Sequence, residues 1–332
     1  MYLTKTSELV GNTPLLELPL NIANDWHLLL KLEKFNPGQS MKDRMAINMV
    51  KQAELNGELK PGGIIIESSS GNTGVGLSII AAERGYKFIA IVDHHAAKDK
   101  IAIMKAYGAQ IIKVDSSKYA QNEVAVKERE ALAKKLSEEI PNSVFLQQAD
   151  NPANAEGYTT LGMEIIKQTN GKISSLIGSV GTGGSLCGTA RRLKEFNPEI
   201  EVIGVEPFGS VIFGGEEKPY FQSGTGNPGN VSIGKNVIYG LIDQGLKVSD
   251  EEAFNTARYL ARTKGLLVGG AAGGVIYMAI QQLRQKLVSG HMVAIIADGG
   301  EKYLDTVFDD EWMQKNNLIS NEVENNLRLL IK

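Results

Sequence analysis

Cysteine and histidine are scarce in this sequence, which excludes several kinds of site. The 332 residues include one cysteine, Cys187, and four histidines. A single thiol permits no internal disulfide and no zinc site built on cysteines, and it fits a reducing compartment. The adjacent pair His94 and His95 is predicted at a strand end, where neighbouring side chains do not converge on one ion. We therefore predict no metal site.

Long apolar runs and an excess of basic charge are also missing. No segment has the roughly 20 apolar residues of a membrane-spanning helix. Residues 1–14 lack the basic and apolar regions of a signal peptide. The net charge of −3 argues against a surface for nucleic acid. We therefore expect a cytoplasmic protein that contacts neither membrane nor nucleic acid.

Glycine, by contrast, is abundant, with 36 residues, and glycine-rich turns separate short apolar runs from helical patterns. This alternation predicts βα units around mostly parallel sheets, an α/β fold, and the chain length favours two domains. The long aperiodic segment 207–235 predicts a functional or disordered loop. Strands are predicted at 63–67, 87–92, 110–114, 143–147, 173–180, 201–206 and 292–297, and helices at 42–53, 77–84, 98–107, 123–138, 187–196, 250–263 and 275–286.

One glycine-rich turn has the properties of a phosphate site. Its glycines let backbone amides approach an anion at a helix start, and its two hydroxyls add donors. It is not a P-loop, because no Gly-Lys-Ser/Thr follows, and a leucine replaces the third glycine of a dinucleotide fingerprint. The alternative is a turn that serves chain geometry alone. The turn consists of Gly181, Thr182, Gly183, Gly184 and Ser185.

Lys42 is predicted at the start of a helix, which is an unusual place for a lysine. The positive end of the helix dipole opposes its charge and favours the neutral amine. A neutral amine is what Schiff-base chemistry requires. The alternative is an ordinary solvated surface lysine.

A second helix start, at residues 68–74, is dense in small hydrogen-bond donors. Its amides and its serine and threonine hydroxyls could cradle a carboxylate. The alternative is a helix N-cap with a tight turn. Taken together, the three segments offer an amine for an aldehyde, a cup for a phosphate and a cup for an amino-acid carboxylate.

These motifs, in the same order along the chain, resemble those of the cysteine synthase and cystathionine β-synthase family, fold-type II of the pyridoxal-phosphate enzymes. The resemblance runs from about residue 5 to residue 315. The matching segments are 11–15, 36–44, 70–74, Gln148, 151–154, 181–185 and 300–303.

The resemblance implies two three-layer α/β domains with mostly parallel twisted sheets and an active site in the cleft between them. The smaller, mobile domain is expected at 43–150. The larger domain, which binds the cofactor phosphate, is expected at 1–42 plus 151–315. Residues 316–332 are expected as a polar tail that forms one late amphipathic helix or frays. A homodimer is expected on the same ground.

The resemblance also implies residue roles. Pyridoxal 5′-phosphate is the implied cofactor, and Lys42 is the implied catalytic residue, which forms the Schiff base and acts as general base. Asn72 is implied to contact the ring hydroxyl, and residues 181–185 to hold the phosphate. The implied site for the substrate carboxylate consists of Ser69, Ser70, Thr73 and Gln148.

The implied reaction is β-elimination or β-replacement on a 3-substituted L-alanine, through an aminoacrylate, in cysteine and hydrogen sulfide metabolism. Cysteine, O-acetylserine and O-phosphoserine are the expected small amino-acid substrates. Two closer resemblances stay open: an enzyme that converts cysteine and water to serine and hydrogen sulfide, and one that couples O-phosphoserine to glutamate for a siderophore precursor. A non-catalytic metabolite-binding relative is the alternative from another class.

The sequence departs from the family pattern at three places. Ala271 and Ala272 stand where a serine usually faces the pyridine nitrogen, so water or Asp298 is the expected replacement. Ala149 stands where an aromatic residue is usual, which predicts a wider pocket beside the β-carbon. The loop 207–235 differs from that of the plain O-acetylserine enzymes. Arg129, expected on a solvated helix face, is an alternative partner for a leaving phosphate.

Overall fold

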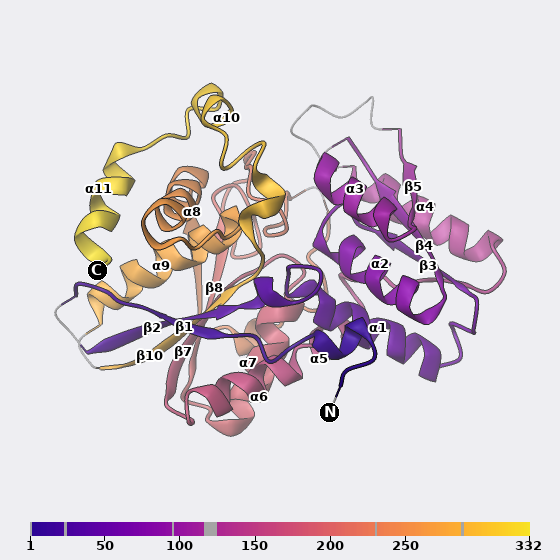
Figure 1. The fold of residues 1–332 in the computed structure, drawn as a ribbon, viewed down its shortest axis with the longest axis horizontal. Helices are drawn as coiled ribbons and strands as arrows, with labels where there is room; N and C mark the ends of the chain where they lie inside the picture. The colour runs from indigo at the N-terminus through magenta and orange to yellow at the C-terminus, as the bar shows by residue number, and fades with distance from the viewer. Residues whose placement is uncertain (1, 23–24, 95, 116–124, 230, 287–288) are drawn as a thin grey trace.

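Two β-sheets organise the chain (Figure 1). The computed structural model describes residues 2–22, 25–94, 96–115, 125–229, 231–286 and 289–332. The larger sheet has the strand order β1-β2-β10-β7-β8-β9, and the smaller one β5-β4-β3-β6. Every pairing is parallel except β1 with β2, which confirms the predicted α/β fold.

The smaller sheet is buried on both faces. Neighbouring residues of a strand point to opposite sides, so Ile65 joins the core under α1 and α2 while Ile66 joins the core under α4. This explains the unbroken apolar run, which is typical of parallel strands covered on two sides. The elements are β3 (Ile64–Ser68), β4 (Lys87–Val92), β5 (Gln110–Lys113), β6 (Ser143–Phe145), α1 (Lys42–Leu55), α2 (Asn72–Arg84), α3 (Lys98–Ala106) and α4 (Val126–Glu139).

The larger sheet is covered in the same way. Val293 of β10 faces the core with α6 and α7, and Met292 faces the core with α8 and α9, which gives three layers (Figure 1). The strands are β1 (Leu15–Leu18), β2 (Trp26–Leu32), β7 (Ile173–Ser179), β8 (Glu201–Pro207), β9 (Gln244–Val248) and β10 (Gly290–Ile296). The helices are α5 (Pro152–Glu156), α6 (Thr159–Gln168), α7 (Gly184–Phe196), α8 (Asp250–Lys264) and α9 (Gly270–Gln285), and short 3₁₀ helices lie at Thr6–Leu9, Glu33–Phe35, Tyr239–Leu241 and Gly300–Tyr303.

The C-terminal segment packs on the larger sheet's side of the molecule. After α10 (Asp310–Lys315), helix α11 (Asn321–Leu330) buries Val323 and Leu327 in the core that contains α8 and α9. Of the two outcomes expected for this segment, the structure therefore has the helix.

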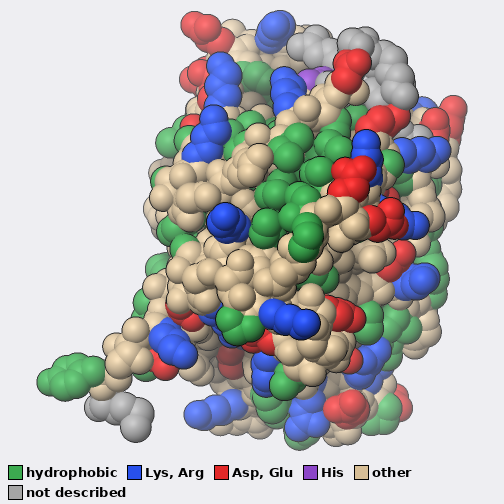
Figure 2. Space-filling model, turned by 90° about the vertical axis from the view of Figure 1, so that its right-hand side faces the viewer, with side chains coloured by type: hydrophobic (Ala, Val, Ile, Leu, Met, Phe, Trp, Pro, Cys, Tyr) green, Lys and Arg blue, Asp and Glu red, His purple; other side chains and the backbone are tan. Residues whose placement is uncertain are grey.

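The surface seen from the side of the smaller sheet carries both signs of charge. Basic and acidic side chains are interspersed over this face and do not gather into one basic area (Figure 2). No helix in the described part of the chain combines the length and apolarity that a bilayer crossing requires.

Three helices begin earlier than the sequence predicts. The expected starts were residues 77, 187 and 275, whereas α2 begins at Asn72, α7 at Gly184 and α9 at Gly270. Glycine has a low helix propensity, which placed these residues in turns, yet the first helical turn needs no hydrogen bond from its own amides. The glycine-rich segments are therefore helix N-termini, with their amides unpaired within the helix.

Candidate active site

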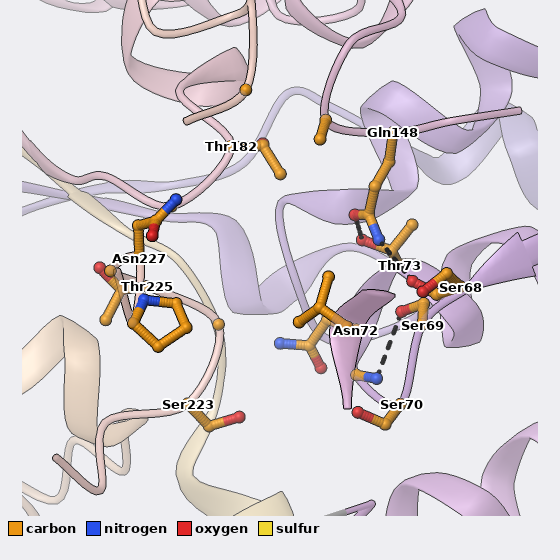
Figure 3. Close-up of a pocket in the computed structure, with 18 of the residues that line it drawn as sticks. Ser68, Ser69, Ser70, Asn72, Thr73, Gln148, Thr182, Ser223, Thr225 and Asn227 are labelled. Carbon is orange, nitrogen blue, oxygen red and sulfur yellow. Dashed lines mark hydrogen bonds between the residues drawn. The ribbon is translucent and has the colours of Figure 1, made fainter. Parts of the chain in front are cut away.

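A cavity of about 530 Å³ lies between the two sheets and receives the predicted site residues. It is bordered by the carboxyl ends of β3, β7 and β10 and by the segment after β6, as expected for ligand sites in parallel α/β proteins. Figure 3 shows Thr182 at one side of the opening and the polar residues of the α2 N-terminus at another. Among the predicted site residues, the cavity lining includes Lys42, Ser69, Ser70, Asn72, Thr73, Gln148, Gly181 and Thr182.

Lys42 is the first residue of α1, and two hydrogen bonds fix the backbone there. Met41 N donates to Ala297 O at 2.8 Å, and Lys42 N donates to Ser40 Oγ at 3.2 Å. Burial lowers the pKa of the Lys42 amine to about 8, although the negative charge of Asp298 opposes the shift. Within the described residues its Nζ has no hydrogen-bond or ion-pair partner. The amine is thus available for chemistry in the cavity.

The α2 N-terminus is organised by its own side chains. Ser69 Oγ accepts hydrogen bonds from Gly71 N at 3.3 Å and Gly74 N at 3.1 Å. Thr73 Oγ1 donates to Gln148 Oε1 at 2.7 Å, and Gln148 Nε2 donates to Ser68 O at 3.1 Å. Figure 3 shows these side chains grouped on one side of the opening. They form a preorganised polar cup of the kind that holds a carboxylate.

The α7 N-terminus has the shape of an anion cradle. Gly183, its N-cap, has φ +85°, and no side chain caps the helix. A Cβ on Gly183 would lie 2.6 Å from Val237 Cα, and one on Gly184 would lie 2.1 Å from Asn154 Oδ1. Gly181 and Thr182 line the cavity, whereas Gly183, Gly184 and Ser185 form the helix start behind them. Uncapped amides and obligatory glycines fit a bound phosphate.

A buried polar network links the two sides of the cavity. Asn72 Nδ2 donates to Asp298 Oδ2 at 2.8 Å, and Tyr303 OH donates to the same oxygen at 2.6 Å. Lys302 Nζ donates to Asn72 Oδ1 at 2.9 Å. Asn72 belongs to α2 and the other residues follow β10, so these bonds join the smaller sheet's side to the larger one.

Two of the three alanines that depart from the family pattern also line the cavity. Ala271 lies at the start of α9, and Ala149 follows Gln148. Asp298, the candidate replacement for the missing hydroxyl, borders the same space. A Cβ on Gly269 would lie 2.0 Å from Asp298 Oδ1, so the carboxylate stands against the α9 N-terminus.

Several lining residues were not predicted. Lys100 and Ser223 border the cavity, and so does Glu67, whose pKa burial raises to about 8. A signal for Lys100 exists, because it stands four residues before the buried Met104 and so shares the inner face of α3. Residues 218–228 also border the cavity, which agrees with a functional loop.

Two carboxylates, the buried Glu206 and the half-buried Asp250, anchor that loop. Glu206 accepts hydrogen bonds from Ile212 N, Phe213 N and Ser210 Oγ, and it pairs with Lys247 Nζ. Near the middle of the loop, Asp250 accepts bonds from the backbone amides of residues 221 and 222. The segment 208–229 is thereby ordered without helix or strand.

Arg129, which was expected on a solvated helix face, is instead buried and borders the cavity. The other residues set aside on sequence grounds lie elsewhere. Cys187 is buried in α7, as predicted. His95 lies outside the described residues. No group of three histidine, cysteine or carboxylate side chains that could hold a metal occurs in the part of the chain described.

Comparison with known proteins agrees with this geometry. The family described as "Pyridoxal-phosphate dependent enzyme" matches residues 6–298. A putative cysteine synthase of Sinorhizobium fredii is 51% identical, over 96% of this chain and 94% of its own. The O-acetylserine dependent cystathionine β-synthase of Helicobacter pylori superposes with a TM-score of 0.84 at 32% identity, covering 92% of this chain and 98% of the other. A hydrogen sulfide-producing enzyme of Fusobacterium nucleatum also gives 0.84 at 32% identity, covering 91% and 100%.

The fold and the cavity thus define a pyridoxal-phosphate dependent enzyme of fold-type II. The chain belongs to the cysteine synthase and cystathionine β-synthase family, as the motifs indicated.

Proposed function

We propose that this enzyme catalyses β-elimination or β-replacement on a 3-substituted L-alanine, with Lys42 as the lysine that binds the cofactor. The observation that carries the proposal is the convergence of three features on one cavity. These are the unpaired, half-buried amine of Lys42, the uncapped α7 N-terminus and the cup formed by Ser69, Thr73 and Gln148.

Lys42 has the properties of a proton acceptor. The bound cofactor supplies the electron sink that makes the substrate's α-hydrogen acidic. With its pKa lowered to about 8 by burial, the Lys42 amine is neutral in a far larger fraction near neutral pH than a solvated lysine. It can therefore take the α-proton onto Nζ and deliver it elsewhere, as general base and then acid.

The α2 cup orients the substrate for that transfer. Its amides and hydroxyls hold the α-carboxylate, with Ser69, Ser70, Thr73 and Gln148 as the proposed ligands. When the α-proton has moved to Lys42, the β-substituent departs with its bonding electrons. A nucleophile then bonds to the β-carbon, and the proton returns to the α-carbon. The balance is a replacement of one β-substituent by another.

A second candidate is the conversion of cysteine and water to serine and hydrogen sulfide. Two observations favour it. Ala149 leaves room in the cavity for water, and one similar structure is that of a hydrogen sulfide-producing enzyme. Coupling of O-phosphoserine to glutamate is a third candidate reaction, and measurements with these two anionic substrates test it.

We further propose that residues 43–150 move as a smaller domain against 1–42 plus 151–315, in a cytoplasmic homodimer. The bonds of Asn72 to Asp298 and Lys302 are among the contacts that such a motion would break and remake. Sedimentation of the purified enzyme tests the dimer, and a mass equal to one chain contradicts it.

The function is tested by giving the cofactor-loaded enzyme cysteine, O-acetylserine or O-phosphoserine, with sulfide, glutamate or water as acceptor. Products are identified by mass spectrometry. Lys42→Ala should abolish turnover and the visible band expected at roughly 410 nm from a lysine-bound cofactor. Lys51→Ala, on the exposed side of the same helix, is the matched control. Absence of turnover on every pair, or a fully active Lys42→Ala, would refute the proposal.

A further inference from the structure

Lys100 is a buried cation in the cavity without a carboxylate partner. Its side chain is 2% exposed and borders the cavity. Its Nζ donates to Ser223 Oγ at 3.3 Å and to Tyr303 OH at 3.4 Å, and it lies 4.6 Å from the centroid of the Tyr303 ring. None of the described residues forms an ion pair with it, although Asp298 and Asp305 act on it from longer range. Buried charges in proteins are usually paired.

Ser223 connects Lys100 to the cavity. Ser223 Oγ accepts from Lys100 and borders the cavity, so it brings the lysine's charge to the edge of the open space. Ser70 has a parallel arrangement, since its Oγ accepts from Arg129 Nη1 at 3.4 Å. In Figure 3 the two hydroxyls extend toward each other from opposite sides of the opening. Two hydroxyls, each backed by a cation, therefore face one region.

The carboxylates Glu130 and Asp150 also border the cavity, and neither forms an ion pair with Lys100. Arg129, 8% exposed, has its Nε 3.3 Å from Asp93 Oδ2, so part of its charge is compensated from behind. One carboxylate oxygen of Asp298, Oδ2, accepts hydrogen bonds from Asn72 and Tyr303. Burial raises the pKa of Glu67 to about 8, which keeps that carboxyl largely protonated at neutral pH. Among the described residues, Lys100 is thus a cation of the cavity that lacks an ion-pair partner.

We propose that Lys100, Ser223 and Arg129 form an anion subsite, separate from the α-carboxylate cup, for an oxyanion on a substrate side chain. Ser70 stands between the two sites and borders both. The ligand class is a phosphate or carboxylate, carried either on the β-substituent of the first amino acid or on the second substrate. This inference rests on the proposed function and names the substrate class for it.

The test compares Lys100→Met with Lys100→Arg in the cofactor-loaded enzyme. Lys98→Met is the control, since Lys98 lies on the same helix but is exposed. KM is measured for O-phosphoserine and O-acetylserine with sulfide, and for glutamate with O-acetylserine. A lost bond to a charged group raises KM for the anionic substrate on the order of 10- to 100-fold. O-acetylserine should change less than about threefold, and Lys100→Arg should restore most of the loss.

The KM measurements distinguish the two possible carriers of the oxyanion, the β-substituent and the second substrate. A rise confined to O-phosphoserine places the oxyanion on the leaving group, and one confined to glutamate places it on the second substrate. Equal effects on anionic and neutral substrates, or no rescue by arginine, would overturn the subsite. Should Lys100→Met not accumulate as folded protein, Ser223→Ala replaces it, with the same selective loss expected and an unselective loss contradicting the idea.

A binding measurement keeps this inference apart from the proposed function. Calorimetric titration of the cofactor-loaded protein with inorganic phosphate should show binding that Lys100→Met weakens and Lys98→Met leaves unchanged. If no substrate pair turns over, the proposed function fails, yet phosphate binding lost in Lys100→Met would still support the subsite. Phosphate binding that Lys100→Met leaves intact would refute it.

Discussion

Asn72 Nδ2 lies 2.8 Å from Asp298 Oδ2 and donates a hydrogen bond to it, which joins the start of α2 to the end of β10. The same carboxylate raises the pKa of Lys42, Lys100 and Lys302 against the lowering caused by burial. Asp298 is therefore a common electrostatic partner of the lysines around the cavity. Removal of the Asp298 carboxylate should therefore first change the pKa values of these lysines.

Asp298→Asn should lower the pKa of Lys42 below its value of about 8. Loss of a nearby negative charge destabilises the ammonium form, so the neutral amine appears at lower pH. The rate at which cofactor-free protein captures pyridoxal phosphate rises with pH as Lys42 deprotonates. The midpoint of that rise should therefore move to lower pH. Asp305→Asn, which removes a carboxylate that acts on Lys100 instead, should leave it unchanged, and an upward shift in Asp298→Asn would contradict the assignment.

Thr73→Val should weaken substrate binding. Valine keeps the shape of threonine but removes the hydroxyl that donates to Gln148 at 2.7 Å. One lost hydrogen bond in a buried site costs about 1–3 kcal/mol, so KM for the amino acid should rise roughly 5- to 100-fold with a smaller change in kcat. Thr73→Ser keeps the donor and should retain most of the affinity. Steady-state kinetics check this, and equal losses in both variants would argue for a packing role.

Gly184→Ala should impair cofactor binding. The added Cβ would stand 2.1 Å from Asn154 Oδ1, so the α7 start must shift, at a cost of about 1–3 kcal/mol. Equilibrium dialysis should show weaker pyridoxal-phosphate binding, and the melting temperature of the cofactor-free protein should fall. Gly240→Ala meets nothing within 4 Å and should behave as wild type. A fully retained affinity in Gly184→Ala would show that the α7 start does not hold the phosphate.

Ala149→Phe should narrow the choice of nucleophile. Ala149 borders the cavity, and a phenyl ring there fills space that a larger acceptor would need. Sulfide should remain an acceptor while glutamate loses at least about tenfold in kcat/KM. Competition between the two acceptors, followed by product analysis, measures the ratio. An unchanged ratio would show that the nucleophile enters by another side.

The glycine-rich turns could be recognised in the sequence because each lies between the end of a predicted strand and the start of a predicted helix. Gly181 and Thr182 could be placed beside a ligand in this way, and so could Thr73, since carboxyl ends of parallel strands meet at one edge. The motifs that start helices are short and local, so the order of strands and helices along the chain can be predicted from the sequence. The starts of α2, α7 and α9 were not, because glycine propensity conceals a helical first turn.

Other parts depended on contacts distant in sequence. β1, β2 and β9 were not predicted, and they occupy the two ends of the larger sheet. Lys100 and Ser223 stand 123 positions apart in the sequence, and no local sequence pattern predicts that they are in contact. The pairing follows only when α3 and the loop after β8 are brought to one cavity.

The anchoring of the loop after β8 has a consequence for how substrate choice changes over time. Glu206 and Asp250 hold it at residues 212, 213, 221 and 222 through backbone amides, and such bonds do not depend on which side chains those residues carry. Exposed positions of the lining segment, such as 218 and 219, can therefore be exchanged while the loop keeps its path, whereas Thr225 and Asn227 also bond through their side chains. Through exchanges at such exposed positions, the same scaffold can present different side chains to the cavity while Lys42 stays in place.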